Sequence, residues 1–177
     1  AEIDYRKDHD FCRTIAENSA VLLKNDSQIL PLRSTQNLAF IGDFVEHPRI
    51  QGRGSAHVYS ETADNLWDFV RKSNQISYAQ GYDSTGTEID WDLIKEAKQI
   101  AEKAEIAVIF AGLLEEEEQE GFDRKHMKLP ENQTKLILEI ASVQPDIVIV
   151  LYNGSPVEMP WIDRVKGVLE MYLPGEA

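Results

Sequence analysis

Cysteine is nearly absent from this chain, which has only Cys12 among its 177 residues. A single cysteine excludes an intrachain disulfide, and it favours a reducing, cytoplasmic compartment over an oxidising one. Long hydrophobic runs are missing too. Runs such as Ile147–Tyr152 fall far short of the ~20 apolar residues that a membrane-spanning helix needs. The sequence therefore belongs neither to the disulfide-stabilised scaffolds nor to the helical membrane proteins.

Basic residues are also scarce, with 18 Lys and Arg against 31 Asp and Glu and a formal net charge of -13. Such a surface repels phosphate backbones and anionic lipid headgroups, which argues against nucleic acid and membranes as partners. Neutral ligands meet no such conflict. The charge balance is compatible with sugars as substrates.

Signals for a bound metal or cofactor are missing as well. No metal-ligand spacing relates the four histidines, which are His9, His47, His57 and His126. The stretch Gly52–Ser55 lacks the Lys-Ser/Thr ending of a phosphate loop, and no dinucleotide fingerprint with three glycines occurs. Gly154-Ser155-Pro156 is not a nucleophile elbow, because proline stands where that turn needs glycine. We expect neither a metal nor a cofactor.

What the chain does contain is an alternation of apolar runs and amphipathic segments. Strands are predicted at residues 38–41, 76–79, 106–113, 147–152 and 168–173. Helices are predicted from Asp10 to Leu23, around Leu66 with Thr62 or Asp64 as its cap, from Trp91 to Ala104, and from Pro130 onward. Alternating strands and helices indicate βαβ units, and continuously apolar strands indicate burial on both faces. The sequence predicts a mostly parallel, doubly wound sheet in a three-layer αβα sandwich.

The length fits a single domain. We expect residues 1–35 to form a leading helix and linker, and residues 36–177 to form the sheet and its helices. The chain stops directly after its last predicted strand, where a covering helix would normally follow. This pattern predicts a fragment of a larger enzyme that is truncated at the C-terminus.

In doubly wound sheets, ligands bind beyond the carboxyl ends of the strands. Three features are expected there: Gly42-Asp43 with the turn Gln51–Ser55, the acidic loop Glu115–Arg124, and Asn153–Pro156. The acidic loop is either a solvated charge run or the source of a general acid, since crowded carboxylates raise one another's pKa. Composition alone leaves open which of its five glutamates would act.

Short segments spread over nearly the whole chain match one known family in order. They are Ala16–Asn25, Leu30–Leu32, Ile41-Gly42, Gln51–Ser55, Glu118–Arg124, Leu129-Pro130, Asn153–Trp161 and Tyr172–Ala177. Together they resemble the second, α/β-sandwich domain of glycoside hydrolase family 3, which contains many β-glucosidases and related exo-acting enzymes. The resemblance implies a retaining β-glycosidase that hydrolyses terminal β-linked sugars.

In that family, as the resemblance implies, an N-terminal barrel supplies an Asp nucleophile and this domain supplies the general acid/base. The acid/base matches best to Glu120, with Glu118 as runner-up and Glu116 third. Asp123 and Arg124 would then support the loop, where the rigid donor fork of arginine is suited to pinning it. One departure is position 117, where family members commonly have tryptophan and this chain has glutamate.

Two other readings stay open at this point. The chain could be a catalytically silent homologue that serves as a carbohydrate-binding or scaffold module, which would bind sugar while its parent protein lacks the nucleophile. It could also be an unrelated flavodoxin-like or nucleotide-binding α/β domain, which titration with flavins and nucleotides would reveal. The interval between Ser55 and Glu115 is too short for the large sugar-binding insertion that some family members carry.

Overall fold

The computed structural model describes residues 4–55, 57–60 and 62–177. In these residues one sheet is present, with strand order β1-β6-β5-β4-β2-β3. The strands are β1 (Val21–Asn25), β2 (Leu38–Ile41), β3 (Ile76–Ala79), β4 (Ile106–Gly112), β5 (Ile147–Tyr152) and β6 (Gly167–Glu170). Every neighbouring pair is parallel except β1 with β6, which is antiparallel. The prediction of a mostly parallel sheet is confirmed.

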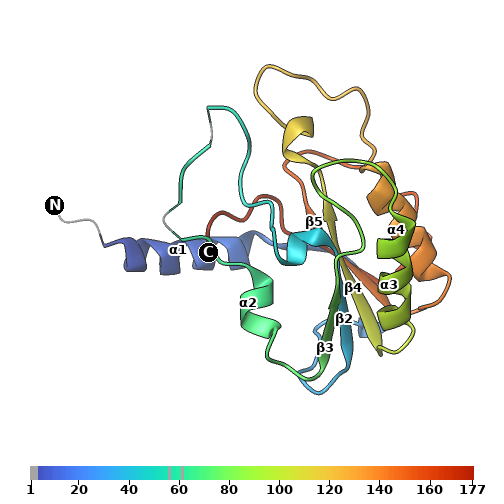
Figure 1. Cartoon of the computed structure of the whole chain (residues 1–177). Helices are drawn as coiled ribbons and strands as arrows, with labels where there is room; N and C mark the ends of the chain where they lie inside the picture. The colour runs from blue at the N-terminus through green and yellow to red at the C-terminus, as the bar shows by residue number, and fades with distance from the viewer. Residues whose placement is uncertain (1–3, 56, 61) are drawn as a thin grey trace.

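Helices cover both faces of this sheet, as Figure 1 shows. The helices of the described residues are α1 (Tyr5–Ser19), α2 (Leu66–Val70), α3 (Trp91–Ala101) and α4 (Glu131–Ala141), with short 3-10 turns η1 (Asp26–Gln28), η2 (Asp43–Val45), η3 (Glu115–Glu117) and η4 (Ile162–Arg164). Helices α3 and α4 pack on one face, and the short α2 packs on the other. No helix in the described part of the chain is long and apolar enough to cross a bilayer.

The core consists of two apolar layers, one on each side of the sheet. Strands β4 and β5 are buried at every residue, which explains why their sequences are apolar throughout. Successive side chains of a strand point to opposite faces. Ile109 therefore packs beneath α3 and α4 with Leu136, whereas Phe110 packs on the side of α2 with Phe40 and Trp67.

The prediction that the first helix continues to Leu23 is wrong. Helix α1 ends at Ser19, and Val21–Asn25 pairs with β6, from Val21 opposite Glu170 to Asn25 opposite Gly167. Without β1 the edge of β6 would present unpaired N–H and C=O groups, and this pairing satisfies them. Leu22 and Leu23 remain about half exposed, so they do not extend a core-facing helical stripe.

Several smaller boundaries also differ from the sequence prediction, among them the end of β6 and the start of α2. Strand β6 ends at Glu170 rather than Leu173, because Tyr172 has a positive φ of 56°, which a strand does not accommodate. Helix α2 is capped by Asn65 rather than Thr62 or Asp64. The Asn65 side chain accepts a hydrogen bond of 2.9 Å from the Asp68 amide, which satisfies one of the free N–H groups of the first turn.

Candidate active site

The segments that follow β2, β4 and β5 meet at one edge of the sheet, since the carboxyl ends of parallel strands share an edge. The turn 51–55 lies against the acidic loop 115–124 through a bridge between Arg53 and Gln119. Arg53 Nη1 also forms an ion pair of 2.5 Å with Glu116 Oε1. Segment 153–156 contacts the same loop through Glu118. The prediction that these features gather at one edge is confirmed.

Glu120 stands exposed on the acidic loop. Its Oε2 accepts hydrogen bonds from the Ser55 hydroxyl and, at 3.3 Å, from the Ser55 amide. The hydroxyl of Ser55, followed by its amide, lowers the pKa of the Glu120 carboxyl because both donors favour the ionised form. In this chain alone, the contacts with Ser55 therefore favour the carboxylate form of Glu120.

Ser55→Ala is expected to raise the pKa of Glu120 toward the value of an ordinary glutamate. The variant removes the hydroxyl donor that favours the carboxylate, so protonation becomes easier and the titration moves to higher pH. Carbon-13 NMR titration of the Glu120 carboxyl measures the shift. The control is Ser34→Ala, at an exposed serine in the loop before β2, which should leave the Glu120 curve unchanged. An unchanged curve in Ser55→Ala would contradict the contact.

Glu118 lies in very different surroundings, with a side chain only 11% exposed. Oε2 accepts from Arg49 Nη1 and, at 2.9 Å, from the Gly154 amide, while Oε1 accepts from the Ser155 hydroxyl. Burial raises the pKa of Glu118, but the hydrogen bonds from Ser155, Gly154 and Arg49 outweigh this effect and the net pKa is lowered. Both oxygens of the Glu118 carboxylate therefore accept hydrogen bonds from other segments of the chain.

The expectation that crowding would raise the pKa values of the loop glutamates is wrong for both Glu118 and Glu120. Each carboxylate has hydrogen-bond donors of its own from other segments of the chain. Glu117 is also engaged, because its Oε2 accepts a 2.9 Å hydrogen bond from the Leu114 amide. This glutamate, at the position that departs from the family pattern, stabilises the turn at the start of the loop.

The two residues expected to support the loop behave differently. Arg124 Nη1 donates to the Ser155 hydroxyl at 2.9 Å and to the Pro156 carbonyl at 3.0 Å. Asp123 is exposed, and within the described residues it forms no ion pair with Arg124. The far end of the loop is thus attached to segment 153–156 through Arg124.

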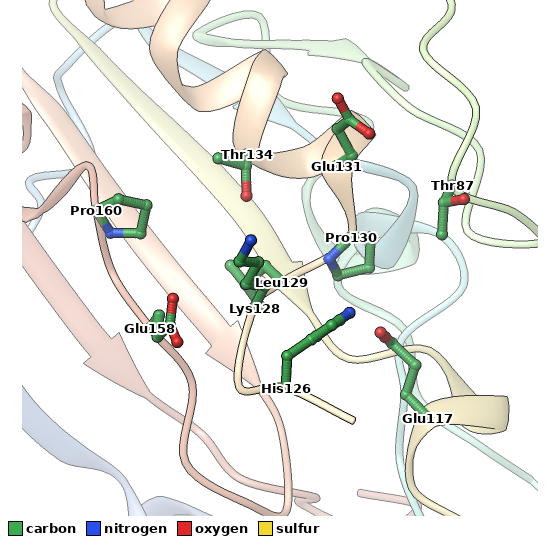
Figure 2. Close-up of a pocket in the computed structure, with 10 residues that line it drawn as sticks. All are labelled: Thr87, Glu117, His126, Lys128, Leu129, Pro130, Glu131, Thr134, Glu158 and Pro160. Carbon is green, nitrogen blue, oxygen red and sulfur yellow. The ribbon is translucent and has the colours of Figure 1, made fainter. Parts of the chain in front are cut away.

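A pocket of about 740 Å³ lies where the end of this loop meets the start of α4. Its lining residues are Thr87, Glu117, His126, Lys128, Leu129, Pro130, Glu131, Thr134, Glu158 and Pro160 (Figure 2). Neither Glu118 nor Glu120 lines this pocket. The candidate carboxyls therefore stand outside it, at the edge of the sheet.

Sequence reasoning missed Arg49, which is the ion-pair partner of Glu118. The side chain of Arg49 is 2% exposed and also donates to the Leu113 carbonyl at 3.1 Å. A lone arginine in a loop carries no spacing signal, so the sequence offered no way to find it. Within the described residues, no group of three or more His, Cys, Asp and Glu side chains is arranged to hold a metal ion.

Residues 20–177 match the family model described as the glycosyl hydrolase family 3 C-terminal domain. Over its whole length the chain is 48% identical to thermostable beta-glucosidase B of Acetivibrio thermocellus, of which it covers 24%. Over 98% of its length it is 34% identical to an exo-alpha-(1->6)-L-arabinopyranosidase of Bifidobacterium breve, of which it covers 25%.

Among solved structures, the GH3 beta-glucosidase of Bifidobacterium adolescentis superposes with a TM-score of 0.93 at 35% identity. That alignment covers 99% of this chain and 26% of the other. The chain thus spans about a quarter of the length of these relatives. The family model, the sequence identities and the superposition agree, and the chain belongs to glycoside hydrolase family 3 as its C-terminal domain.

Proposed function

We propose that this chain supplies the general acid/base of a retaining β-glycosidase whose Asp nucleophile lies on a separate N-terminal barrel domain. The observation that carries the proposal is the contrast between two glutamates of one loop. The side chain of Glu118 is only 11% exposed and accepts hydrogen bonds from three donors, whereas Glu120 is exposed at the edge of the sheet, where its donors come from the exposed Ser55. Glu120 is the carboxyl that a sugar held by another domain can reach.

In the proposed reaction, neutral Glu120 donates its proton to the glycosidic oxygen while the C–O bond breaks. The barrel carboxylate attacks the anomeric carbon from the opposite face and forms a glycosyl-enzyme ester. The Glu120 carboxylate then takes a proton from a water molecule, whose oxygen attacks the same carbon and displaces the nucleophile. Two inversions give net retention, and the geometry requires the two carboxyls to stand about 5–5.5 Å apart.

A general acid must be protonated, yet Ser55 favours the ionised form of Glu120 in this chain. Desolvation of the carboxyl by a docked barrel and a bound sugar would raise its pKa, because burial disfavours the charged form. The proposed role therefore requires the second domain both for the nucleophile and for the protonation state of Glu120.

Terminal β-linked glucosides are the proposed substrates, in keeping with the beta-glucosidase names of the Acetivibrio thermocellus and Bifidobacterium adolescentis relatives. The Bifidobacterium breve relative is named an exo-alpha-(1->6)-L-arabinopyranosidase. An assay panel should therefore include aryl α-L-arabinopyranosides beside aryl β-D-glucosides.

The test is to express the full-length protein that contains this chain and to follow hydrolysis of an aryl β-D-glucoside by proton NMR. Retention predicts that β-glucose appears first and that α-glucose accumulates only later, by mutarotation. Initial release of α-glucose would rule out the retaining mechanism. Sugar binding without hydrolysis would instead support a carbohydrate-binding module.

A further inference from the structure

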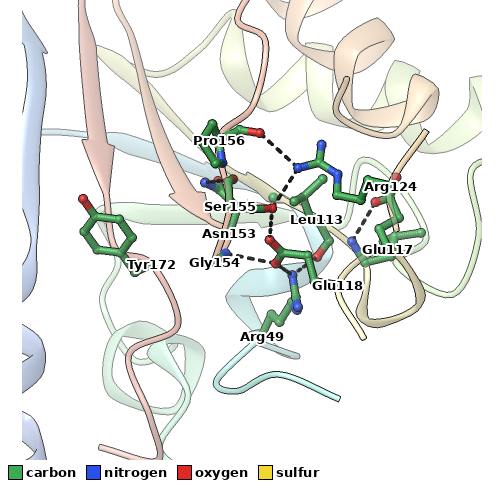
Figure 3. A network of polar contacts seen from close by, with 12 residues as sticks. Arg49, Leu113, Glu117, Glu118, Arg124, Asn153, Gly154, Ser155, Pro156 and Tyr172 are labelled. Atoms are coloured by element: carbon green, nitrogen blue, oxygen red, sulfur yellow. Dashed lines mark hydrogen bonds and ion pairs between the residues drawn. The ribbon is translucent and has the colours of Figure 1, made fainter. Parts of the chain in front are cut away.

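The acidic loop is attached to the sheet edge through Glu118 and through Arg124, and the Ser155 hydroxyl forms a hydrogen bond with each of these two residues (Figure 3). We propose that Glu118 and Arg49 form a positioning pair that fixes the loop and thereby sets the location of Glu120. This inference rests on the acid/base role proposed above for Glu120. It assigns Glu118 a function other than proton transfer.

The first attachment is the ion pair between Arg49 and Glu118. Arg49 Nη1 donates both to Glu118 Oε2 and to the carbonyl of Leu113, the residue directly after β4. The Gly154 amide, just beyond the end of β5, donates to the same Glu118 oxygen at 2.9 Å. The Glu118 carboxylate is therefore connected to the ends of β4 and β5, the two middle strands of the sheet.

The second attachment is made by Arg124. The Ser155 hydroxyl donates to Glu118 Oε1 and accepts from Arg124 Nη1 at 2.9 Å, so one hydroxyl joins the two residues that flank the segment carrying Glu120. Arg124 Nη1 additionally donates to the Pro156 carbonyl at 3.0 Å. Figure 3 shows Glu118 and Arg124 approaching Ser155 from the loop.

Between the two attachments lies a short arch, Gln119–Asp123, that carries Glu120. Glu120 follows Glu118 by two residues, so their Cα atoms can be no more than about 7 Å apart. Fixing Glu118 consequently restricts where the Glu120 carboxyl can go. Proton transfer needs that carboxyl within hydrogen-bond reach of the glycosidic oxygen.

Proton transfer by Glu118 itself is incompatible with these contacts. Protonating Glu118 would remove the negative charge that compensates Arg49, whose side chain is only 2% exposed. Within the described residues, Nε and Nη2 of Arg49 are buried and have no hydrogen-bond partner. Breaking one partner of a buried ion pair leaves the other charge uncompensated, which is strongly unfavourable.

The test compares Glu118→Ala with Glu120→Ala in the full-length protein. We expect Glu118→Ala to lower kcat about 10- to 100-fold, the size of effect that a misplacement of ~1 Å produces. Its pH–rate profile should still fall at basic pH (the basic limb), because Glu120 remains as the group that loses its proton there. Sodium azide should not restore its turnover, since the Glu120 carboxylate remains and repels the anion.

Glu120→Ala should behave in the opposite way. Water needs the Glu120 carboxylate as a general base, whereas azide is already an anion and needs none. Its nitrogen attacks the anomeric carbon of the glycosyl-enzyme, displaces the Asp carboxylate and yields a β-glycosyl azide. Turnover of an activated substrate should recover with azide, and the basic limb should disappear. Glu115→Ala, at an exposed glutamate that begins the same loop, is the matched control and should keep wild-type kinetics.

Ser155→Ala and Ser155→Thr provide a second, milder pair should Glu118→Ala fail to fold. Alanine removes the shared hydroxyl and should lower kcat with the basic limb retained, whereas threonine keeps the hydroxyl and should restore most of the rate. Three results would overturn the positioning role alone. Azide could restore the turnover of Glu118→Ala, this variant could lose the basic limb of its pH–rate profile, or either Glu118→Ala or Ser155→Ala could keep the wild-type kcat. An inactive wild-type protein would refute the proposed function and the positioning role together.

Discussion

Glu120→Gln in the full-length protein is expected to lower turnover of β-glucosides with poor leaving groups about 10²- to 10⁴-fold, the usual contribution of general acid–base catalysis. An amide has nearly the shape of the carboxyl but no proton to give to the leaving oxygen. Activated leaving groups such as dinitrophenolate need no protonation, so their departure should slow far less. Steady-state kinetics on aryl β-glucosides of graded leaving-group pKa measure this difference.

The pH dependence offers an independent check on the same variant. In the wild type, rates should fall on the basic side as the general acid loses its proton, and Glu120→Gln should remove this limb because no group remains to titrate. Glu115→Gln, in the same loop, is the matched control and should keep both the rate and the profile. Near-normal turnover of poor substrates by Glu120→Gln would remove this residue from the mechanism.

Gly112→Val is expected to have the largest effect on stability. A Cβ at Gly112, the last residue of β4, would stand 2.7 Å from the carbonyl carbon and 3.0 Å from the Cα of Tyr152 on β5, and closer still to the Tyr152 oxygen. These are backbone atoms of a paired strand, so no side-chain rotation relieves the overlap. We expect a loss of about 3 kcal/mol in the free energy of unfolding, at the upper end for overpacked cores.

Urea unfolding of the chain, followed by circular dichroism, measures this loss as a lower midpoint. Gly86→Ala is the control, because a Cβ at Gly86 meets nothing within 4 Å, and its midpoint should stay close to wild type. Equal midpoints for Gly112→Val and the wild type would show that the ends of β4 and β5 separate easily. The carbonyl that anchors Arg49 belongs to Leu113, so a stable Gly112 variant should still disturb the acidic loop.

The parallel core of the fold could be predicted from the sequence because its signal is local. The apolar runs 38–41, 76–79 and 147–152 correspond residue for residue to β2, β3 and β5, and the run 106–113 exceeds β4 by one residue. Strand β1 could not be predicted in this way. Its apolar residues also fit a helical stripe, and its partner β6 lies about 145 residues further along the chain.

The site shows the same division between local and distant information. The order of strands and loops was enough to predict that the acidic loop, the turn 51–55 and the segment 153–156 share an edge. It was not enough to predict that Glu118 accepts hydrogen bonds while Glu120 is exposed. The donors Arg49 and Ser155 lie 69 and 37 residues from Glu118 along the chain. The direction of the pKa shifts depends on the same distant donors, and local crowding of carboxylates predicted it wrongly.

Strand β1 also has a practical consequence for the boundaries of the folding unit. A shorter piece beginning at residue 36 would lack Val21–Asn25 and would leave the backbone N–H and C=O groups along the outer side of β6 without partners. An open strand edge of this kind recruits strands from other molecules and promotes aggregation. Strand β1 thus covers the outer side of β6, and a shortened version of this domain has to keep it in order to resist aggregation.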